Sequence, residues 1–322
     1  MLSLKKKEEI VKDYLSGRIC RLVAKECEVS YQTVYNILHT SGVPMRNDRR
    51  IPIHNEDAFS KITPESSYWV GFLLSDGCVH WLRGKYPKLV VELEIGDWGH
   101  LEKLRRFLGS ETNVKPSHRG RAARFEITSE KIVEDLRQLD VVPCKSITAK
   151  VSPLLAESRD FWRGMVDGDG NPGIHKNSGC PHIGLIGTAA VIESFHEFCG
   201  MGGTIGRSGK LSTLVFYSYN ASDLAKKLYD GTDIFLDRKK VIADQIMQYE
   251  QRCCECRQII IGRDSHAKTC SSCLPVAKRR KALEYKTKRI KEEVGRGRNP
   301  CHNCIKRDSL PGKKLCFHCN EY

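Results

Sequence analysis

The sequence predicts an α+β protein whose centre is a tandem repeat, with a small all-α domain before it and two small zinc-ribbon modules after it. Three observations support this class. The pattern helix, hairpin, helix, hairpin, helix (αββαββα) occurs twice within residues 65 to 250, and equivalent points lie 93 residues apart. Residues 1 to 45 have the apolar spacing of short amphipathic helices. Four Cys-x-x-Cys pairs follow residue 250.

Residues 8 to 42 are expected to form three short helices within a domain that spans 1 to 45. Ser30 is a typical N-cap for the last of them. The stretch resembles the helix-turn-helix of resolvases and transposases, although Glu28 stands at the turn where that family usually has glycine. The resemblance implies DNA binding, with Gln32 and Asn36 contacting base edges. A plain three-helix bundle without a role in DNA binding is the alternative.

Residues 46 to 64 are rich in arginine and proline, which favours a basic, extended linker. The repeat follows as two halves, 65 to 150 and 151 to 250. In the first half we expect a helix over 65–76, strands between 78 and 95, a helix over 100–108, strands over 113–128 and a helix over 129–139. In the second half we expect a helix over 159–169, strands between 173 and 187, a helix over 189–199, strands over 203–219 and helices over 221–249. Such a pseudo-two-fold molecule suits a substrate with approximate two-fold symmetry.

The first helix of each half is apolar and ends in Asp-Gly. The two segments read Trp69-Val-Gly-Phe-Leu-Leu-Ser-Asp-Gly77 and Trp162-Arg-Gly-Met-Val-Asp-Gly-Asp-Gly170. Each has small residues four positions apart on one helical face, which lets two backbones approach closely. We therefore expect the two helices to pack against each other through these small residues, which are Gly71, Ser75, Gly164 and Gly168.

Such a crossing brings Asp76 and Asp169 side by side at the same end of the helix pair. Two carboxylates repel each other there, and the negative end of each helix dipole disfavours them further. Divalent cations relieve this repulsion, and hard oxygen ligands suit Mg²⁺. The same ions can hold the attacking water and the leaving oxygen of a phosphodiester. The alternative for one copy is a simple helix-to-strand turn, but two copies in matching places disfavour it.

Both nonapeptides resemble the LAGLIDADG motif, and the similarity spans residues 65 to 250. It implies a single-chain homing endonuclease, a metal-dependent enzyme that cuts a long, weakly symmetric double-stranded DNA site. The implied fold is a saddle of two four-stranded antiparallel sheets, with Asp76 and Asp169 as catalytic metal ligands. The family also has a basic residue near the metals, and Lys145 and Lys239 match that position; a solvated lysine is the alternative. Asp167 matches a position that does not bind metal, so we leave it out of the site.

Basic residues of the hairpins are candidate DNA contacts, because side chains on strands in a major groove reach base edges and phosphates. Any one of them is also compatible with a plain solvated surface. The candidates are Arg83, Lys85, Lys115, Arg119, Arg121, Arg124, Lys176, Arg207 and Lys210.

The cysteine pairs after residue 250 have the spacing of closed, four-thiolate zinc sites. We expect one structural Zn²⁺ in residues 251 to 275, another in 301 to 322, and a basic helix or linker over 276 to 300. Redox pairs and iron–sulfur ligation are the disfavoured alternatives. The expected ligands are Cys253, Cys256, Cys270 and Cys273 in the first site, and Cys301, Cys304, Cys316 and Cys319 in the second.

The net charge of +14 is concentrated at the ends, because residues 1–50, 51–250 and 251–322 carry +4, −1 and +11. This distribution indicates a polyanionic partner, double-stranded DNA or RNA, rather than a membrane. We expect a monomer in a reducing, intracellular compartment, since neither a secretory signal nor a membrane-spanning run is evident.

Three alternatives to an endonuclease remain at this point. A DNA-binding regulator with this fold would lack the acids, and both are present here. An RNA maturase on the same fold stays open. An intein is not expected, because the chain has neither a nucleophile at position 1 nor a terminal His-Asn pair.

Overall fold

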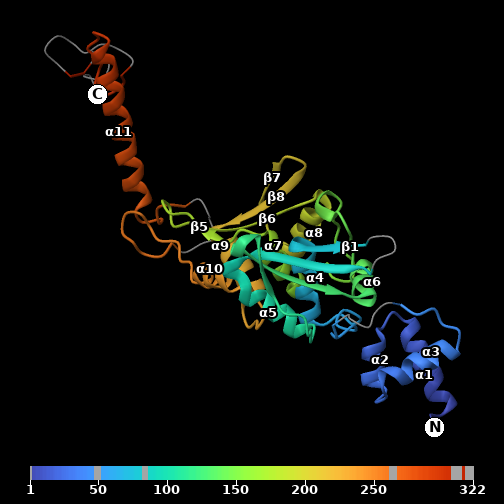
Figure 1. Cartoon of the computed structure of the whole chain (residues 1–322). Helices are drawn as coiled ribbons and strands as arrows, with labels where there is room; N and C mark the ends of the chain where they lie inside the picture. Colours follow the sequence, from blue (N-terminus) through green and yellow to red (C-terminus); the bar gives the residue numbers. More distant parts are fainter. Residues whose placement is uncertain (1, 47–51, 82–85, 261–266, 306–313, 316–322) are drawn as a thin grey trace. The chain divides into compact units, whose positions relative to one another are not determined.

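The chain divides into two compact units, Met1–Tyr249 and Glu250–Tyr322, each of which is described by itself. Figure 1 traces the elements in chain order. None of the described helices is long and apolar enough to cross a membrane. The computed structural model describes residues 2–46, 52–81, 86–260, 267–305 and 314–315.

The amino-terminal segment forms three helices, as the apolar spacing predicts. They are α1 (Leu4–Leu15), α2 (Cys20–Glu26) and α3 (Tyr31–Thr40). Buried residues from all three, among them Ile10, Val23 and Leu38, form a separate small core. The hydroxyl of Ser30 accepts a hydrogen bond from the Thr33 amide and so caps α3. Glu28 adopts a left-handed conformation with φ 55°, which is the backbone geometry that glycine supplies more easily.

The segment predicted as an extended linker is instead partly folded onto the first half of the repeat. Phe59 is only 3% exposed and belongs to the main core. The Asn55 amide donates to the carbonyl of Leu108 at 2.7 Å, and the Glu111 amide donates to that of Ile53 at 3.0 Å. The prediction of an extended linker was wrong here. It rested on the proline and arginine content of the segment, whereas the buried side chain of Phe59 anchors the segment to the core.

Two four-stranded antiparallel sheets with the same strand order confirm the predicted repeat. The first has the order β1-β2-β4-β3 and the second β5-β6-β8-β7. Along β4 the buried side chains of Ala123, Phe125 and Ile127 alternate with more exposed ones, so one face of the sheet covers the core. The strands are β1 (Gly77–His80), β2 (Lys88–Glu94), β3 (Lys115–Ser117), β4 (Ala122–Thr128), β5 (Gly173–Ile174), β6 (Pro181–Gly187), β7 (Thr204–Ser208) and β8 (Leu211–Tyr217).

Helices cover the apolar faces of the sheets, and α4 (Pro64–Asp76) and α7 (Arg159–Asp169) lie between the two halves. Each begins at a strong N-cap: Thr63 forms a capping box with Ser66 ahead of α4, and Ser158 caps α7. The remaining helices of this unit are α5 (Trp98–Phe107), α6 (Glu130–Gln138), α8 (Ala189–Cys199), α9 (Ser218–Tyr229) and α10 (Asp237–Met247), with short 3-10 turns η1 (Ile95–Asp97), η2 (His118–Gly120) and η3 (Lys145–Ile147).

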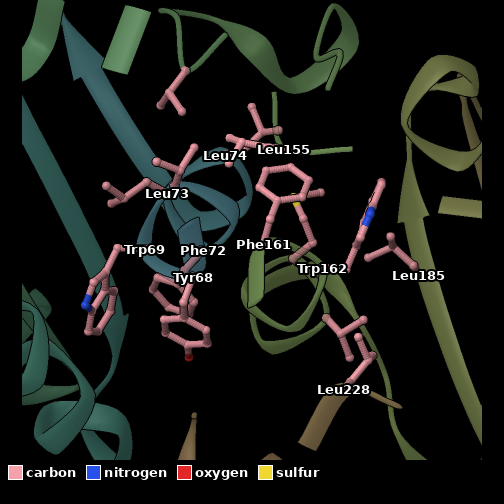
Figure 2. Close-up of a cluster of buried hydrophobic side chains, with 14 of the residues drawn as sticks. Tyr68, Trp69, Phe72, Leu73, Leu74, Leu155, Phe161, Trp162, Leu185 and Leu228 are labelled. Atoms are coloured by element: carbon pink, nitrogen blue, oxygen red, sulfur yellow. The ribbon is translucent and has the colours of Figure 1, made fainter. Parts of the chain in front are cut away.

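The aromatic residues of the two central helices pack in a pseudo-symmetric manner. Trp69 contacts His100 of α5 at a ring separation of 5.0 Å, and the equivalent Trp162 contacts Phe195 of α8 at 4.9 Å. Figure 2 shows the two tryptophans on opposite sides of the helix pair, with Trp162 beside Leu185 of the second sheet. Each central helix therefore anchors its own half while its other face meets its counterpart.

The described part of the second unit contains an isolated β-bridge between Arg252 and Ile259 and the long helix α11 (Leu274–Gly295). Eight of the residues of α11 are lysine or arginine and three are glutamate. Helix α11 overlaps the range 276 to 300, where a basic helix or linker is expected, but it begins at Leu274 and ends at Gly295.

Candidate active site between the two repeat halves

Helices α4 and α7 approach each other at the predicted small residues. A side-chain carbon added to Gly71 would lie 2.0 Å from the carbonyl oxygen of Phe161, and one added to Gly164 would lie 2.1 Å from that of Tyr68. A carbon added to Gly168 would lie 2.3 Å from the Cβ of Ser75. Any larger side chain at these glycines would force the two helix backbones apart.

The glycine that ends each motif is also needed for steric reasons. A Cβ on Gly77 would meet the carbonyl of Leu73 at 2.6 Å, and one on Gly170 would meet that of Val166 at 2.5 Å. Both glycines therefore let the chain turn from the last helical turn directly into the next segment. This turn leaves the preceding aspartate at the very end of its helix.

Asp76 and Asp169 end the two helices, and the charge of Asp169 acts on Asp76. Both residues are exposed to solvent, and neither has a hydrogen-bond partner among the residues that the structure describes. Nearby protein atoms partly desolvate the Asp76 carboxylate, and this desolvation, with the charge of Asp169, raises its pKa to about 6. Desolvation also raises the pKa of Asp169. Two closely spaced carboxylates that resist ionisation form a donor set suited to a hard divalent cation.

Lys145 and Lys239 approach these aspartates from the two halves. The Lys145 ammonium donates to the carbonyls of Ser75, at 3.2 Å, and Gly77. Lys239 is 4% exposed, and its ammonium donates to the carbonyls of Gly168 and Gly170, both at 2.7 Å. The lysines thus bind equivalent carbonyls on either side of the two aspartates. Desolvation lowers the pKa of Lys239 to about 8 and also lowers that of Lys145.

The two lysines lie in different secondary-structure elements. Lys145 begins the 3-10 turn η3, whereas Lys239 lies in the first turn of α10. Lys145 and Asp169 line one cavity of about 180 Å³, together with Ser75, Thr188 and Val191. The cavity joins a cation of the first half to a carboxylate of the second.

Asp167 is completely buried and holds together four parts of the unit. The hydroxyls of Tyr68 and Tyr229 each donate to its carboxylate at 2.7 Å. The Leu236 amide donates to it at 2.8 Å. Asp167 is not among the predicted site residues, because its counterpart in the first half is Leu74; a charged residue within an apolar helix is the sequence signal for a buried network. Asp167 directly precedes Gly168, so this network adjoins the end of the second motif.

The hairpin residues predicted to contact DNA are exposed where the structure describes them. Lys115 lies on β3, and Arg119 and Arg121 lie in and after the 3-10 turn that joins β3 to β4. Arg207 and Lys210 belong to the β7–β8 hairpin, and Lys176 follows β5. Arg83 and Lys85 lie outside the described residues.

Arg124 differs from the other candidates because acidic residues already neutralise it. Its guanidinium lies 2.9 Å from Glu126 and 3.7 Å from Glu92, and Lys88 pairs with Glu126 as well. Lys115 is the cross-strand neighbour of Arg124 in the β3–β4 register. The outer face of the first sheet therefore carries paired positive and negative side chains rather than a uniformly positive surface.

The second sheet presents aromatic rings that the basic pattern did not reveal. His175 and His182 have ring centroids 4.6 Å apart, and Tyr217 lies 6.2 Å from His175 and 6.3 Å from His182. Desolvation by burial, with the nearby charge of His175, lowers the pKa of His182, which favours the neutral form of this ring. Flat aromatic rings on a sheet surface suit stacking.

On α3, Gln32 and Asn36 are exposed on the side opposite the core, and the Gln32 amide donates to the Asn36 side chain at 3.0 Å. The two therefore form one polar patch. Amide groups fixed in this way can present both a donor and an acceptor to a base edge.

In the second unit, Cys253, Cys256, Cys270 and Cys273 come together, with their sulfur atoms all within 4.8 Å of one another. The Cys270 amide donates to the sulfur of Cys253 at 3.3 Å. Backbone amides such as those of Cys256 and Cys270 lower the pKa of the Cys253 thiol to about 6, which favours the thiolate that zinc binds. For the second predicted site, Cys301 is buried and Cys304 half-buried, whereas Cys316 and Cys319 lie outside the described residues.

No protein-family model and no curated protein matches the sequence. Solved structures do resemble part of the chain. The LAGLIDADG meganuclease I-AabMI bound to uncleaved DNA is 13% identical, covers 57% of this chain and 88% of its own, and gives a TM-score of 0.43. The homing endonuclease I-GzeII in complex with its DNA target is 14% identical over 57% and 88%, with a TM-score of 0.41. I-SmaMI bound to uncleaved DNA in the presence of calcium ions is 15% identical over 58% and 91%, with a TM-score of 0.40.

Proposed function

We propose that the chain is a site-specific DNA endonuclease of the LAGLIDADG type, which hydrolyses phosphodiester bonds of a long, weakly symmetric double-stranded site. The observation that carries this proposal is the placement of Asp76 and Asp169. They end two helices that pack at the boundary between two equivalent antiparallel sheets. A pair of acids on a pseudo-two-fold axis is suited to two scissile phosphates, one on each DNA strand.

The acids fit Mg²⁺ by their chemistry. Their oxygens are hard ligands, and neither aspartate has a hydrogen-bond partner in the described part of the chain. Desolvation raises the pKa of both, and the charge of Asp169 adds to this effect at Asp76. When bound, Mg²⁺ would supply Lewis acidity and a more acidic water. Asp76 and Asp169 would hold it, and the protein would otherwise contribute positive charge beside the phosphate.

That positive charge comes from Lys145 and Lys239. Their ammonium groups lower the pKa of both aspartates, which opposes the increase caused by desolvation. We assign the pair a positive electrostatic field at the site, which would stabilise the charge that develops on the phosphate without requiring both lysines to contact it. Their carbonyl partners fix them before substrate arrives, so little reorganisation is required during the reaction.

DNA is the substrate that best fits the remaining surfaces. The exposed residues Lys115, Arg119, Arg121, Arg207 and Lys210 would contact phosphates or bases, and Gln32 and Asn36 of α3 would contact a flanking major groove. The rings of His175, His182 and Tyr217 add a stacking surface. The second unit, with net charge +11 over residues 251–322 and a four-cysteine zinc site, would bind the same polyanion non-specifically.

The decisive experiment starts from purified protein incubated with a genomic or randomised DNA library and Mg²⁺, followed by sequencing of the new ends. Asp76→Asn and Asp169→Asn should each abolish double-strand cleavage of the selected site while leaving binding in Ca²⁺ nearly unchanged. Asp140→Asn is a matched control, because this aspartate pairs with Lys150 away from the motif helices. Full cutting by either motif variant would refute the two-acid mechanism.

The same assay separates the two alternatives. Specific binding without any cleavage by the unaltered protein would favour a DNA-binding regulator. Selection of an RNA in preference to every duplex would favour a maturase.

A further inference from the structure

The two lysines beside the aspartates make different numbers of hydrogen bonds. An ammonium group has three hydrogens to donate. Lys239 directs all of them to backbone carbonyls, since it bonds Val166 at 2.9 Å in addition to Gly168 and Gly170. Lys145 bonds only Ser75 and Gly77 among the described residues, so one of its hydrogens remains available.

The two lysines also differ in burial, and again Lys239 is the less accessible one. Lys239 is 4% exposed. Lys145 is half-buried, and it lines the cavity that also contains Asp169. A substrate phosphate can therefore approach Lys145 without displacing protein. Contact with Lys239 would require its ammonium to give up one hydrogen bond to a backbone carbonyl, and a buried carbonyl without a hydrogen-bond partner is costly in free energy.

The buried carboxylate of Asp167 accounts for the fixed position of Lys239. It accepts the amide of Leu236, the N-cap residue of α10, and Lys239 follows three residues later. It also accepts the hydroxyl of Tyr229, at the end of α9. Asp167 thus ties both sides of the α9–α10 connection to α7. In the first half Leu74 stands at the equivalent position and cannot accept a hydrogen bond, and Lys145 lies in a single 3-10 turn.

We propose that the two half-sites are chemically unequal: Lys145 is the lysine that donates to the substrate phosphate, whereas Lys239 is a sequestered cation that holds the second motif, with Asp167 as its positioning residue. The assignment to substrate rests on the proposed function. The inequality of the lysines and the role of Asp167 do not. A nuclease built in this way cuts its two DNA strands at different rates, because only one half-site has a free ammonium donor.

Limited reductive methylation of the free full-length protein, read by peptide mass spectrometry, tests the inequality without any DNA. Lys145 should be labelled about tenfold faster than Lys239, because labelling of Lys239 requires local opening. Asp167→Asn, which keeps the shape but removes the charge, should accelerate labelling of Lys239 and leave Lys145 unchanged. Equal labelling of the two lysines, or unchanged protection of Lys239 in a folded Asp167→Asn variant, would overturn the proposal.

Tyr229→Phe provides a second variant should Asp167→Asn fail to fold, since it removes only one hydroxyl from the network. It should also expose Lys239 to labelling. Tyr249→Phe is the matched control, because it removes a hydroxyl from the same half without contacting Asp167. If both tyrosine variants change Lys239 equally, the effect is general loosening and the positioning role is refuted.

Cleavage of a duplex labelled separately on each DNA strand tests the substrate assignment. Lys145→Met should slow one strand about 100-fold more than the other, as expected for loss of a donor used in the transition state, so that nicked duplex accumulates. Equal slowing of both strands would overturn the assignment to Lys145. If no duplex is ever cut, the proposed function fails, and the labelling experiment still decides whether the lysines are unequal.

Discussion

At the scale of single residues, the carboxylate of Asp76 is subject to opposing effects on its pKa. Desolvation and Asp169 raise its pKa, whereas Lys239, Lys145 and Arg238 lower it, and the net result is a pKa of about 6. An isolated, fully exposed aspartate would gain less free energy from binding a cation, because it has no repulsion from a second carboxylate for the cation to relieve. The Asp76 carboxylate therefore stays ionisable near neutrality, and within the described residues no protein group is hydrogen-bonded to either motif aspartate.

This shift predicts how the stability of the metal-free protein depends on pH. Because the folded-state pKa of Asp76 is about 6 and its ordinary value is 3.8, the folded state binds more protons than the unfolded state between these values. The free energy of unfolding should therefore fall as pH rises through this window. Urea unfolding in EDTA should show a shallower fall for Asp76→Asn, and the control Asp140→Asn should match the unaltered protein. A slope that Asp76→Asn leaves unchanged would contradict the assigned pKa.

At the scale of elements, the packing of α4 on α7 depends on positions without side chains. Gly71→Ala or Gly164→Ala would place a carbon about 2 Å from a backbone oxygen of the other helix. We expect each to lower the free energy of unfolding by about 3 kcal/mol or more, measured by urea titration. Gly99→Ala in α5 is the matched control: nothing lies within 4 Å of its added carbon, and alanine favours a helix by about 0.5–1 kcal/mol. A tolerated Gly71→Ala would mean that the helices are not in this contact.

The second unit makes a prediction about metal content. Four cysteine sulfur atoms within 4.8 Å of one another would need a cation to coexist as thiolates. Few apolar residues are buried in the described part of this unit, so we expect its folding to depend on that cation. We expect two zinc ions per chain by elemental analysis. Cys256→Ser should lower this number to one, whereas Cys254→Ser, which alters an exposed neighbour outside the cluster, should not change it. Metal-free protein with a folded second unit would exclude the zinc assignment.

At the scale of the whole molecule, positive charge lies mainly in the amino-terminal segment and the second unit, while both aspartates lie in a nearly neutral repeat. Under the proposed function, binding and chemistry would be divided between parts of the chain. Non-specific attraction from the ends would increase encounters with DNA, and the sheets and α3 would supply contacts that differ with sequence.

Removing residues 251 to 322 tests this division. The truncation deletes a net charge of +11 but leaves the unit Met1–Tyr249 complete. Cleavage should survive, while affinity falls and the plot of log K against log salt flattens by about 0.9 for each lost phosphate contact. Removing residues 1 to 45 should instead shorten the footprint on one side, because α3 occurs once per chain. Unchanged footprint and salt slope in both truncations would show that the ends bind something other than the target.

The sequence by itself determined the repeat, most element boundaries, the small residues of the helix pair and the first cysteine cluster. Each of these is recorded in local spacing: 3.6-residue and two-residue periodicities, N-caps such as Ser30 and Ser158, Asp-Gly ends and Cys-x-x-Cys pairs. The duplication is a further signal, because a simple turn does not explain the same pattern twice at a constant period.

Only the tertiary structure decided which charged groups have partners. Arg124 is neutralised by Glu92 and Glu126 across neighbouring positions of the sheet. Asp167 meets Tyr68, which lies 99 residues away in the chain. Lys239 is held by three carbonyls while the equivalent Lys145 has two. Such differences have no local signature, because a hydrogen-bond partner is selected by distance in space after packing is complete, and residue type alone fixes only what a side chain is able to bind.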